Sequence, residues 1–226
     1  RHRALAAHLN TSEQARAQAL RRAQDRTAFE IARGRMREIL GGYLGCAPRK
    51  VPLLTGPHGR PILGAAAGAR APAFNLAHAA GWAALAIGPH GLALGIDIER
   101  HRPVERAVAE RFFSPAEKAE LAALPEADWA AGFFNAWVRK EALLKALGSG
   151  LMRPLDSFDV TLTPGAPARL LRLSGAQASR WQLYPLTLAA DFPGCIALRH
   201  TGAVALTLRE GRLPLDAPAG AAPQEA

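Results

Sequence analysis

The order of the predicted elements, helix, strands, helices and strands again, indicates an α+β fold. Two kinds of pattern support it: helical periodicity in long segments, and short strand-like runs between turns rich in Gly and Pro. Hydrophobic residues make up 49% of the 226 residues, which is enough for one core or for two small cores side by side. The order of elements also suggests two similar halves.

The first predicted helix spans residues 12–40, where Ser12 can cap the N-terminus and two glycines follow the end. Residues 47–73 are rich in Pro and Gly, which predicts a loop with one short strand. Two strands are predicted next, at 81–87 and 92–99, and the Gly-Pro-His-Gly sequence between them predicts a hairpin.

Three helices are predicted in the middle of the chain, at residues 104–113, 115–124 and 128–147. A Ser-Pro-Ala-Glu sequence opens the second, with a capping residue, a proline at the first helical position and an acid in the first turn. The residues near the C-terminus are rich in Pro, Ala and Gly, and we expect 213–226 to be disordered. Short strands are predicted at 158–162, 168–173, 180–188, 194–200 and 204–208.

The chain is basic, with 28 Lys and Arg against 19 Asp and Glu and a net charge of +9. Such a surface attracts nucleic acid, an anionic membrane, an acidic protein or a phosphate-rich small molecule. An Arg- and Ala-rich composition can also reflect a GC-rich genome, so charge alone leaves these open.

Two cysteines, Cys46 and Cys195, lie far apart and lack the spacing of metal ligands. They predict no disulfide framework and suit a reducing cytoplasm. No run of about 18 uncharged apolar residues is present, so we expect no membrane span. The sequence starts at Arg1, and no signal peptide is visible in it.

Two acidic residues, Asp97 and Glu99, end the second predicted strand of the hairpin. Side chains alternate along a strand, so both carboxylates point to the face opposite the apolar residues. Two adjacent carboxylates repel each other, and a divalent cation bound through oxygen would relieve that. An ordinary solvated face is the alternative, and the pair by itself favours it.

Trp137, Glu141 and Lys145 are four residues apart and share one face of the predicted helix 128–147. Glu141 and Lys145 could form only an exposed ion pair, but the large aromatic on the same stripe favours a face directed inward or into a cleft. Ionisable groups that face a cleft are candidate site residues. Two weaker motifs precede them, Gly-Arg-Pro at 59–61 and Phe-Asn-Leu-Ala-His at 74–78, and each could be an ordinary surface loop.

These motifs occur in one order: Gly-Arg-Pro, Phe-Asn-Leu-Ala-His, Gly-Ile-Asp-Ile-Glu, Phe-Phe-Ser-Pro-Ala-Glu, and Trp-x-x-Lys-Glu-Ala-x-x-Lys-x-x-Gly-x-Gly-Leu. In this combination the chain resembles the surfactin-type phosphopantetheinyl transferase family. The resemblance is clear over residues 59–160 and looser over the helix at 12–40.

The resemblance implies roles for individual residues. Asp97, Glu99 and Glu141 would bind Mg²⁺, with Glu141 and Lys145 catalytic. The remaining residues would bind coenzyme A: Lys140 and Lys145 near its phosphates, Asn75 and His78 from one loop with His78 on a phosphate, and Arg60 with Pro61 beside the adenine end.

This chain departs from the family pattern at two positions. Ala77 stands where the family commonly has Ser, which removes one hydroxyl contact to phosphate, and Arg60 replaces a more usual Lys while keeping its charge. Two early arginines, Arg16 and Arg33, are further candidates for phosphate contact.

The implied reaction is attack of a carrier-protein serine on the β-phosphorus of coenzyme A, with adenosine 3′,5′-bisphosphate leaving. Mg²⁺ and Lys145 would neutralise the pyrophosphate, and Glu141 would take the serine proton directly or through water. An acyl or peptidyl carrier protein is the expected partner, and we expect a cytoplasmic monomer that binds neither nucleic acid nor membrane.

The family fold implies a pseudo-two-fold pair of α+β halves, each a small antiparallel sheet with a long helix, and an active site in the cleft between them. The halves would be residues 1–102 and 103–212. Two other classes stay open: a basic nucleic-acid-binding module, and a metal-dependent phosphoesterase that uses the same carboxylates.

Overall fold

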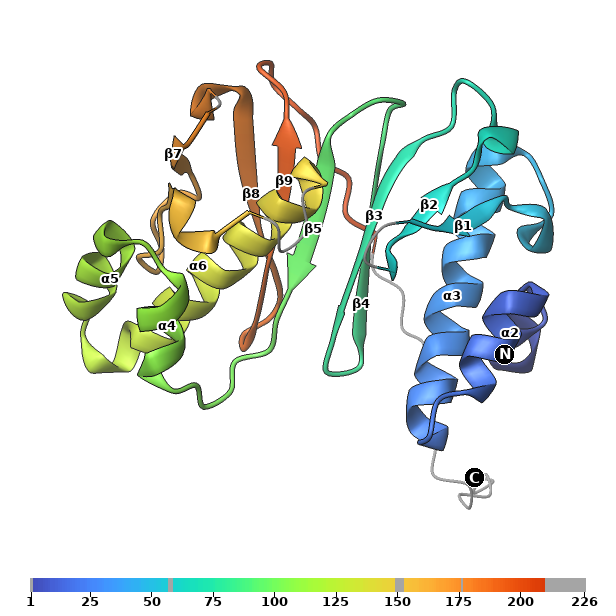
Figure 1. Ribbon diagram of the computed structural model, residues 1–226, viewed down its shortest axis with the longest axis horizontal. Helices are drawn as coiled ribbons and strands as arrows, with labels where there is room; N and C mark the ends of the chain where they lie inside the picture. The colour runs from blue at the N-terminus through green and yellow to red at the C-terminus, as the bar shows by residue number, and fades with distance from the viewer. Residues whose placement is uncertain (1, 57–58, 149–152, 176, 210–226) are drawn as a thin grey trace, which may run out of the picture. The chain divides into compact units, whose positions relative to one another are not determined.

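The computed structural model describes residues 2–56, 59–148, 153–175 and 177–209 (Figure 1). Contacts within the chain divide it into two compact units: residues 1–52 with 203–226, and residues 53–202. The tail predicted to be disordered, 213–226, lies outside the described residues.

The described residues of the first unit form three α-helices, α1 (His2–Ala6), α2 (Thr11–Gln18) and α3 (Ala23–Leu44). The prediction of one helix over 12–40 is therefore wrong, because the chain leaves the helical conformation between α2 and α3. Asn10, rather than Ser12, is the N-cap of α2. Its side chain accepts a hydrogen bond from the Glu13 amide, and the Glu13 carboxylate accepts one from the Asn10 amide, so this capping box starts the helix earlier.

Helix α3 continues through the two glycines that were expected to end it and stops at Gly45, whose φ of 64° is in the left-handed region. Gly34 lets α1 approach closely, because a Cβ there would lie 2.3 Å from the Leu5 carbonyl oxygen. Arg37 is fully buried beneath these helices and bonds Glu13 and the carbonyl of Val51, which fixes the segment that follows α3.

The described residues of the second unit form four small antiparallel sheets. Their strands are β1 (Leu53–Thr55) with β2 (Pro61–Leu63), β3 (Ala73–Ala79) with β4 (Trp82–Gly88), β5 (Leu94–Ile98) with β9 (Phe192–Arg199) and β8 (Trp181–Ala189), and β6 (Phe158–Val160) with β7 (Leu170–Leu173). Together with the helices they confirm the α+β prediction.

The predicted hairpin between 81–87 and 92–99 is wrong in its pairing: β4 pairs with β3, and β5 pairs with β9. Segment 74–78, predicted as a loop, is part of β3. Ala80 and Gly81 have positive φ values of 43° and 84°, the geometry of a two-residue turn whose twist matches a tight hairpin. That turn joins β3 to β4, and β5 pairs instead with β9.

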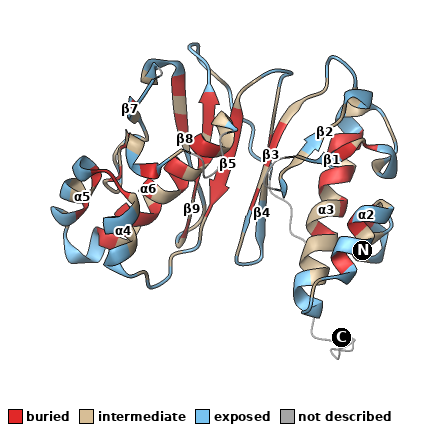
Figure 2. Ribbon diagram, viewed as in Figure 1, coloured by how far each residue is buried: buried red, intermediate tan, exposed pale blue. Residues whose placement is uncertain are grey.

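Helices α4 (Arg106–Phe112), α5 (Pro115–Ala122) and α6 (Glu126–Leu147) lie close to their predicted positions. Ser114 and Glu117 form the predicted capping box, and Gly148 ends α6 with a φ of 68°. Helix α6 packs on β5 and β9 and is buried along most of its length (Figure 2). None of the helices in the described ranges is long and apolar enough to cross a membrane.

Gly95 explains how closely α6 approaches β5. A Cβ at this position would lie 2.1 Å from the Ala142 carbonyl oxygen and 2.5 Å from the Ala146 nitrogen. Only a glycine therefore allows the last two turns of the helix to rest on the middle of the strand.

One further expectation differs from the structure: no strand forms at 204–208. Contacts within the chain divide it near residue 52, and β5 from the first predicted half pairs with β9 from the second. The two similar halves, 1–102 and 103–212, stay a prediction.

Candidate functional site

A partly buried ion pair joins β5 to the last turn of α6. The Lys145 ammonium donates to Asp97 Oδ1 at 2.6 Å, while Asp97 Oδ2 is buried and has no hydrogen-bond partner among the described residues. Burial raises the pKa of Asp97 to about 6, the carboxylates of Glu141 and Glu99 add to the rise, and Lys145 opposes it. The pair therefore keeps one carboxylate oxygen available for another partner.

Glu141 lies one turn before Lys145 on the same face of α6, as predicted. Burial, and to a smaller extent the charge of Glu99, raises the pKa of Glu141, while Lys145 lowers it. The Glu99 carboxylate accepts a hydrogen bond from Arg102 at 2.8 Å. The structure thus brings Asp97, Glu141 and Lys145 into one electrostatic neighbourhood, with Glu99 at its edge.

These carboxylates do not already form a ligand cage. Within the described part of the chain, no group of three or more His, Cys, Asp or Glu side chains is arranged to hold a metal ion. Lys145 and Arg102 now neutralise Asp97 and Glu99, so a cation would have to take over from these two side chains. The three-carboxylate metal site remains a prediction.

Asn75 has a different position from the one that the resemblance implied. It is buried, and its side-chain oxygen accepts a hydrogen bond from the Ile96 amide at 2.8 Å. Strands β3 and β5 share no ladder, so this side chain links them next to Asp97. His78 lies further along β3 and is exposed, as a contact to a ligand would require.

The position of Lys140 contradicts its predicted contact with coenzyme A phosphates. Its side chain is 0% exposed and pairs with Glu117 at 2.7 Å. The ammonium also donates to the carbonyls of Leu155 and Phe158 at 2.7 and 2.6 Å. All three protons are thus used inside the core, because Lys140 is about 140° around the helix from Lys145.

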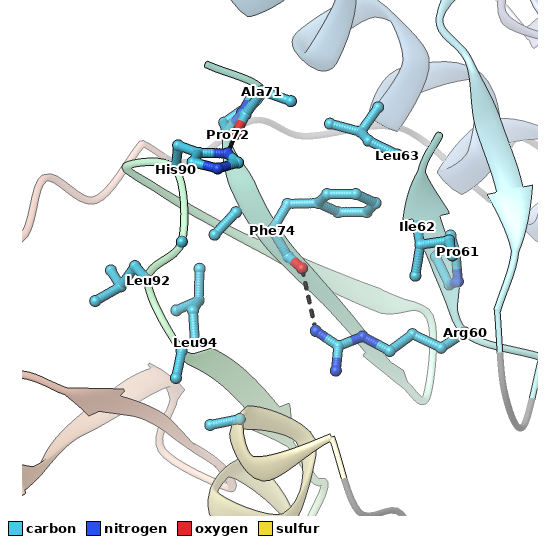
Figure 3. Close-up of a pocket in the computed structure, with 14 residues that line it drawn as sticks. Arg60, Pro61, Ile62, Leu63, Ala71, Pro72, Phe74, His90, Leu92 and Leu94 are labelled. Atoms are coloured by element: carbon cyan, nitrogen blue, oxygen red, sulfur yellow. Dashed lines mark hydrogen bonds between the residues drawn. The ribbon is translucent and has the colours of Figure 1, made fainter. Parts of the chain in front are cut away.

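A pocket of about 300 Å³ lies beside the N-terminal end of β5 (Figure 3). Arg60 and Pro61 line it, together with Phe74 and mostly aliphatic side chains, and their contact with the adenine end of coenzyme A stays a prediction. No sequence pattern predicted that His90 and the residues after it would line the same pocket. His90 is held there by a bond to the Ala71 carbonyl at 2.9 Å, and no motif encodes this contact across 19 residues.

Trp137 packs in an aromatic group on α6 and is only partly buried. Its ring lies 5.7 Å from that of Phe133, in a stacked arrangement, and 6.0 Å edge-on from Phe112. These ring contacts join α6 to α4 on the stripe that leads to Glu141, although the side chain of Trp137 is less buried than a face directed inward would make it.

The early arginines flank one ring in the first unit. Arg16 and Arg33 lie over Phe29 at 5.6 and 5.4 Å from its centroid. The Arg33 guanidinium is also 3.7 Å from the Glu13 carboxylate, and burial lowers its pKa. Their contact with phosphate stays a prediction.

Acidic side chains able to hold a hard cation, next to a lysine, are typical of enzymes that transfer phosphate-containing groups. Residues 93–197 match the family model described as the 4′-phosphopantetheinyl transferase superfamily. The chain is 38% identical over 195 residues to the 4′-phosphopantetheinyl transferase HetI of Nostoc sp.. The aligned region covers 85% of this chain and 78% of HetI. The chain therefore belongs to the 4′-phosphopantetheinyl transferase superfamily.

Shorter matches agree. The chain is 38% identical to the transferase Sfp of Bacillus subtilis over 89 residues, 39% of each protein. It is 39% identical to psf-1 of Bacillus pumilus over 97 residues, 43% of this chain and 41% of that protein. Thermotoga maritima holo-[acyl-carrier-protein] synthase aligns with 49% of this chain and 65% of its own at a TM-score of 0.39 and 18% identity, a similarity too low to support an argument.

Proposed function

We propose that this chain transfers the 4′-phosphopantetheine group of coenzyme A to a serine of an apo acyl or peptidyl carrier protein and releases adenosine 3′,5′-bisphosphate. The observation that carries the proposal is the Asp97–Lys145 pair with Glu141 one helical turn away, in a member of this superfamily. It is a partly buried arrangement of acid and base, and one oxygen of Asp97 is unpaired among the residues that the structure describes.

The side chains fit Mg²⁺ in their donor chemistry. Asp97, Glu99 and Glu141 supply oxygen ligands, which Mg²⁺ prefers. The unpartnered Asp97 Oδ2 and the mutual repulsion of the carboxylates are both relieved by a bound cation. When bound, Mg²⁺ supplies positive charge to the pyrophosphate of coenzyme A.

Two side chains of α6 act on the reacting groups in this proposal. Glu141 accepts the serine proton, and its raised pKa brings its basicity closer to neutral pH. The serine oxygen forms a bond to the β-phosphorus while the bond to the bisphosphate breaks. Lys145, released from Asp97, stabilises the charge that develops on the phosphate oxygens.

The pocket beside Arg60 and Pro61 is our candidate for the adenine end of coenzyme A, because its lining is mostly apolar. His78 on β3 would contact a phosphate, and Ala77, where the family pattern commonly has Ser, supplies no hydroxyl for a second contact. Lys140 has no part in binding, since its protons are used in the core.

The net charge of +9 favours an acidic carrier protein, of fatty-acid, polyketide or peptide synthesis. Both cysteines are free thiols, which suits a cytoplasmic enzyme. We propose that it works as a monomer and binds neither nucleic acid nor membrane.

The test is mass spectrometry of a panel of apo carrier proteins after incubation with enzyme, coenzyme A and Mg²⁺. One carrier should gain the mass of a phosphopantetheine arm, and its Ser→Ala variant and an EDTA-treated reaction should gain nothing. Release of free phosphopantetheine with no modified carrier would instead identify a phosphoesterase. Tight binding of duplex DNA or RNA without transfer would favour the nucleic-acid-binding alternative.

A further inference from the structure

Arg60, the residue before β2, reaches the C-terminal end of α6. Its Nη1 donates to the Lys145 carbonyl oxygen at 2.7 Å. Its Nη2 donates to the Phe74 carbonyl oxygen of β3 at 3.4 Å, as Figure 3 shows. The guanidinium is partly buried, which lowers its pKa, and its Nε has no partner among the described residues. One side chain thus joins the main chains of two elements that carry site residues.

The last turn of a helix needs such a partner. The last carbonyl groups of a helix have no N–H donor within the helix, and the negative end of the helix dipole favours a nearby cation. The Lys145 carbonyl receives the Gly148 amide at only 3.3 Å, so the 2.7 Å bond from Arg60 is the shorter of the two.

Lys145 is held through its side chain as well as through its carbonyl group. The Lys145 ammonium bonds Asp97 on β5, while its carbonyl bonds Arg60. The close contact of α6 with Gly95 leaves the helix little freedom to slide along the strand. Rotation of the last turn is the remaining movement, and Arg60 opposes it.

We infer that Arg60 is a positioning residue, which by bridging the Lys145 and Phe74 carbonyls holds the Lys145 ammonium in register with Asp97 and the reacting phosphate. The inference rests on the proposed function for its kinetic consequence. It assigns Arg60 an effect on turnover, in addition to its place in the lining of the nucleotide pocket.

Kinetics of Arg60→Met and Arg60→Lys, with coenzyme A varied, test the inference. Arg60→Met should lower kcat about 10- to 100-fold, the cost of misplacing a group that stabilises the transition state, and change KM less than about threefold. Arg60→Lys keeps one donor and should recover most of kcat. A rise in KM with kcat unchanged would show that Arg60 acts only on coenzyme A and would overturn the inference.

A double-mutant cycle identifies the route of the effect. In a Lys145→Met background, Arg60→Met should lower kcat by no more than about threefold, because the group that it positions is gone. Equal losses in both backgrounds would contradict a route through Lys145. Arg172→Met is the matched control: this arginine also bonds two carbonyls, of Ser157 and Asp156, and its loss should leave kcat unchanged.

Hydrogen exchange gives a readout that does not depend on transfer. In Arg60→Met, the Gly148 amide and the last amides of α6 should exchange about tenfold faster, while the middle of the helix is unchanged. Unchanged exchange at Gly148 would overturn the inference even if activity falls. A wild-type chain that modifies no carrier would refute the proposed function, and exchange would still decide whether Arg60 fixes the helix end.

Discussion

Helix α6 carries two lysine–carboxylate pairs that share chemistry and differ in surroundings. Lys140 pairs with Glu117 at 2.7 Å, and Lys145 pairs with Asp97 at 2.6 Å. The first pair is 0% and 1% exposed, whereas the second is 28% and 11% exposed. Both lysines come from one motif, five residues apart.

The pairs differ most in how completely their hydrogen bonds are satisfied. Glu117 accepts from the amides of Ser114 and Val160 as well as from Lys140, whose other protons bond two carbonyls. Asp97 bonds Lys145, and its Oδ2 has no hydrogen-bond partner in the part of the chain that the structure describes. A closed network specifies a core, and an open one can exchange its partner for a ligand. The difference separates a structural pair from a site pair.

The largest effect should follow from removing the acid beside the open pair. Glu141→Gln keeps the shape of the side chain and removes the proposed base and one metal ligand, so kcat should fall about 10²- to 10⁴-fold. Steady-state kinetics with one carrier protein measure it, with circular dichroism as the folding control. A near wild-type kcat would exclude both roles.

Removing Lys140 should lower mainly the stability, whereas removing Lys145 should lower mainly kcat. Lys140→Met leaves Glu117 buried without its partner and should cost about 3–5 kcal/mol of the free energy of unfolding. Lys145→Met should leave stability nearly unchanged and lower kcat steeply, because its cation acts on charge that develops in the transition state. Urea unfolding and kinetics on both variants give the comparison.

A second change separates the buried charge from the packing. Lys140→Met with Glu117→Gln removes both charges and should recover part of the stability lost by Lys140→Met alone. The recovered variant should transfer the arm at a rate close to wild type. If it folds and yet transfers poorly, Lys140 acts at the site after all.

The open pair should also respond to pH. The pKa of Asp97 is raised to about 6, so between about pH 4 and 6 the folded protein holds a proton that the unfolded chain has released. The free energy of unfolding should therefore fall as pH rises through that window, by at most roughly 3 kcal/mol from this group. Urea unfolding in EDTA should show a weaker fall in Asp97→Asn, and identical pH profiles would contradict the assignment.

The smallest effect should come from the edge of the site. His78→Ala should raise KM for coenzyme A about tenfold, as expected for the loss of one hydrogen bond to a charged group, and leave kcat nearly unchanged. Kinetics with coenzyme A varied measure this split. His8→Ala in the first unit, where His8 pairs with Glu38, is the control. A fall in kcat alone would place His78 nearer the reacting phosphorus.

The sequence by itself determined the α+β class, the capping box at Ser114 and the shared face of Glu141 and Lys145. These depend on local chemistry: periodicity, a capping side chain and a spacing of four residues on a helix. The same geometry could have excluded Lys140, since five residues turn a helix by about 140° from Lys145. The motif resemblance hid that difference because it treats both lysines alike.

Only the tertiary structure decided the pairings and the partners. Because of the tight turn at Ala80 and Gly81, β4 pairs with β3. Strand β5 pairs with β9, which lies about 100 residues further along the chain. The bond from Arg60 to the Lys145 carbonyl spans 85 residues, and the one from Asn75 to the Ile96 amide spans 21. A backbone N–H or C=O group looks the same at almost every residue, so the sequence does not indicate which one a side chain will bond. Such contacts are decided by packing and not by any local pattern.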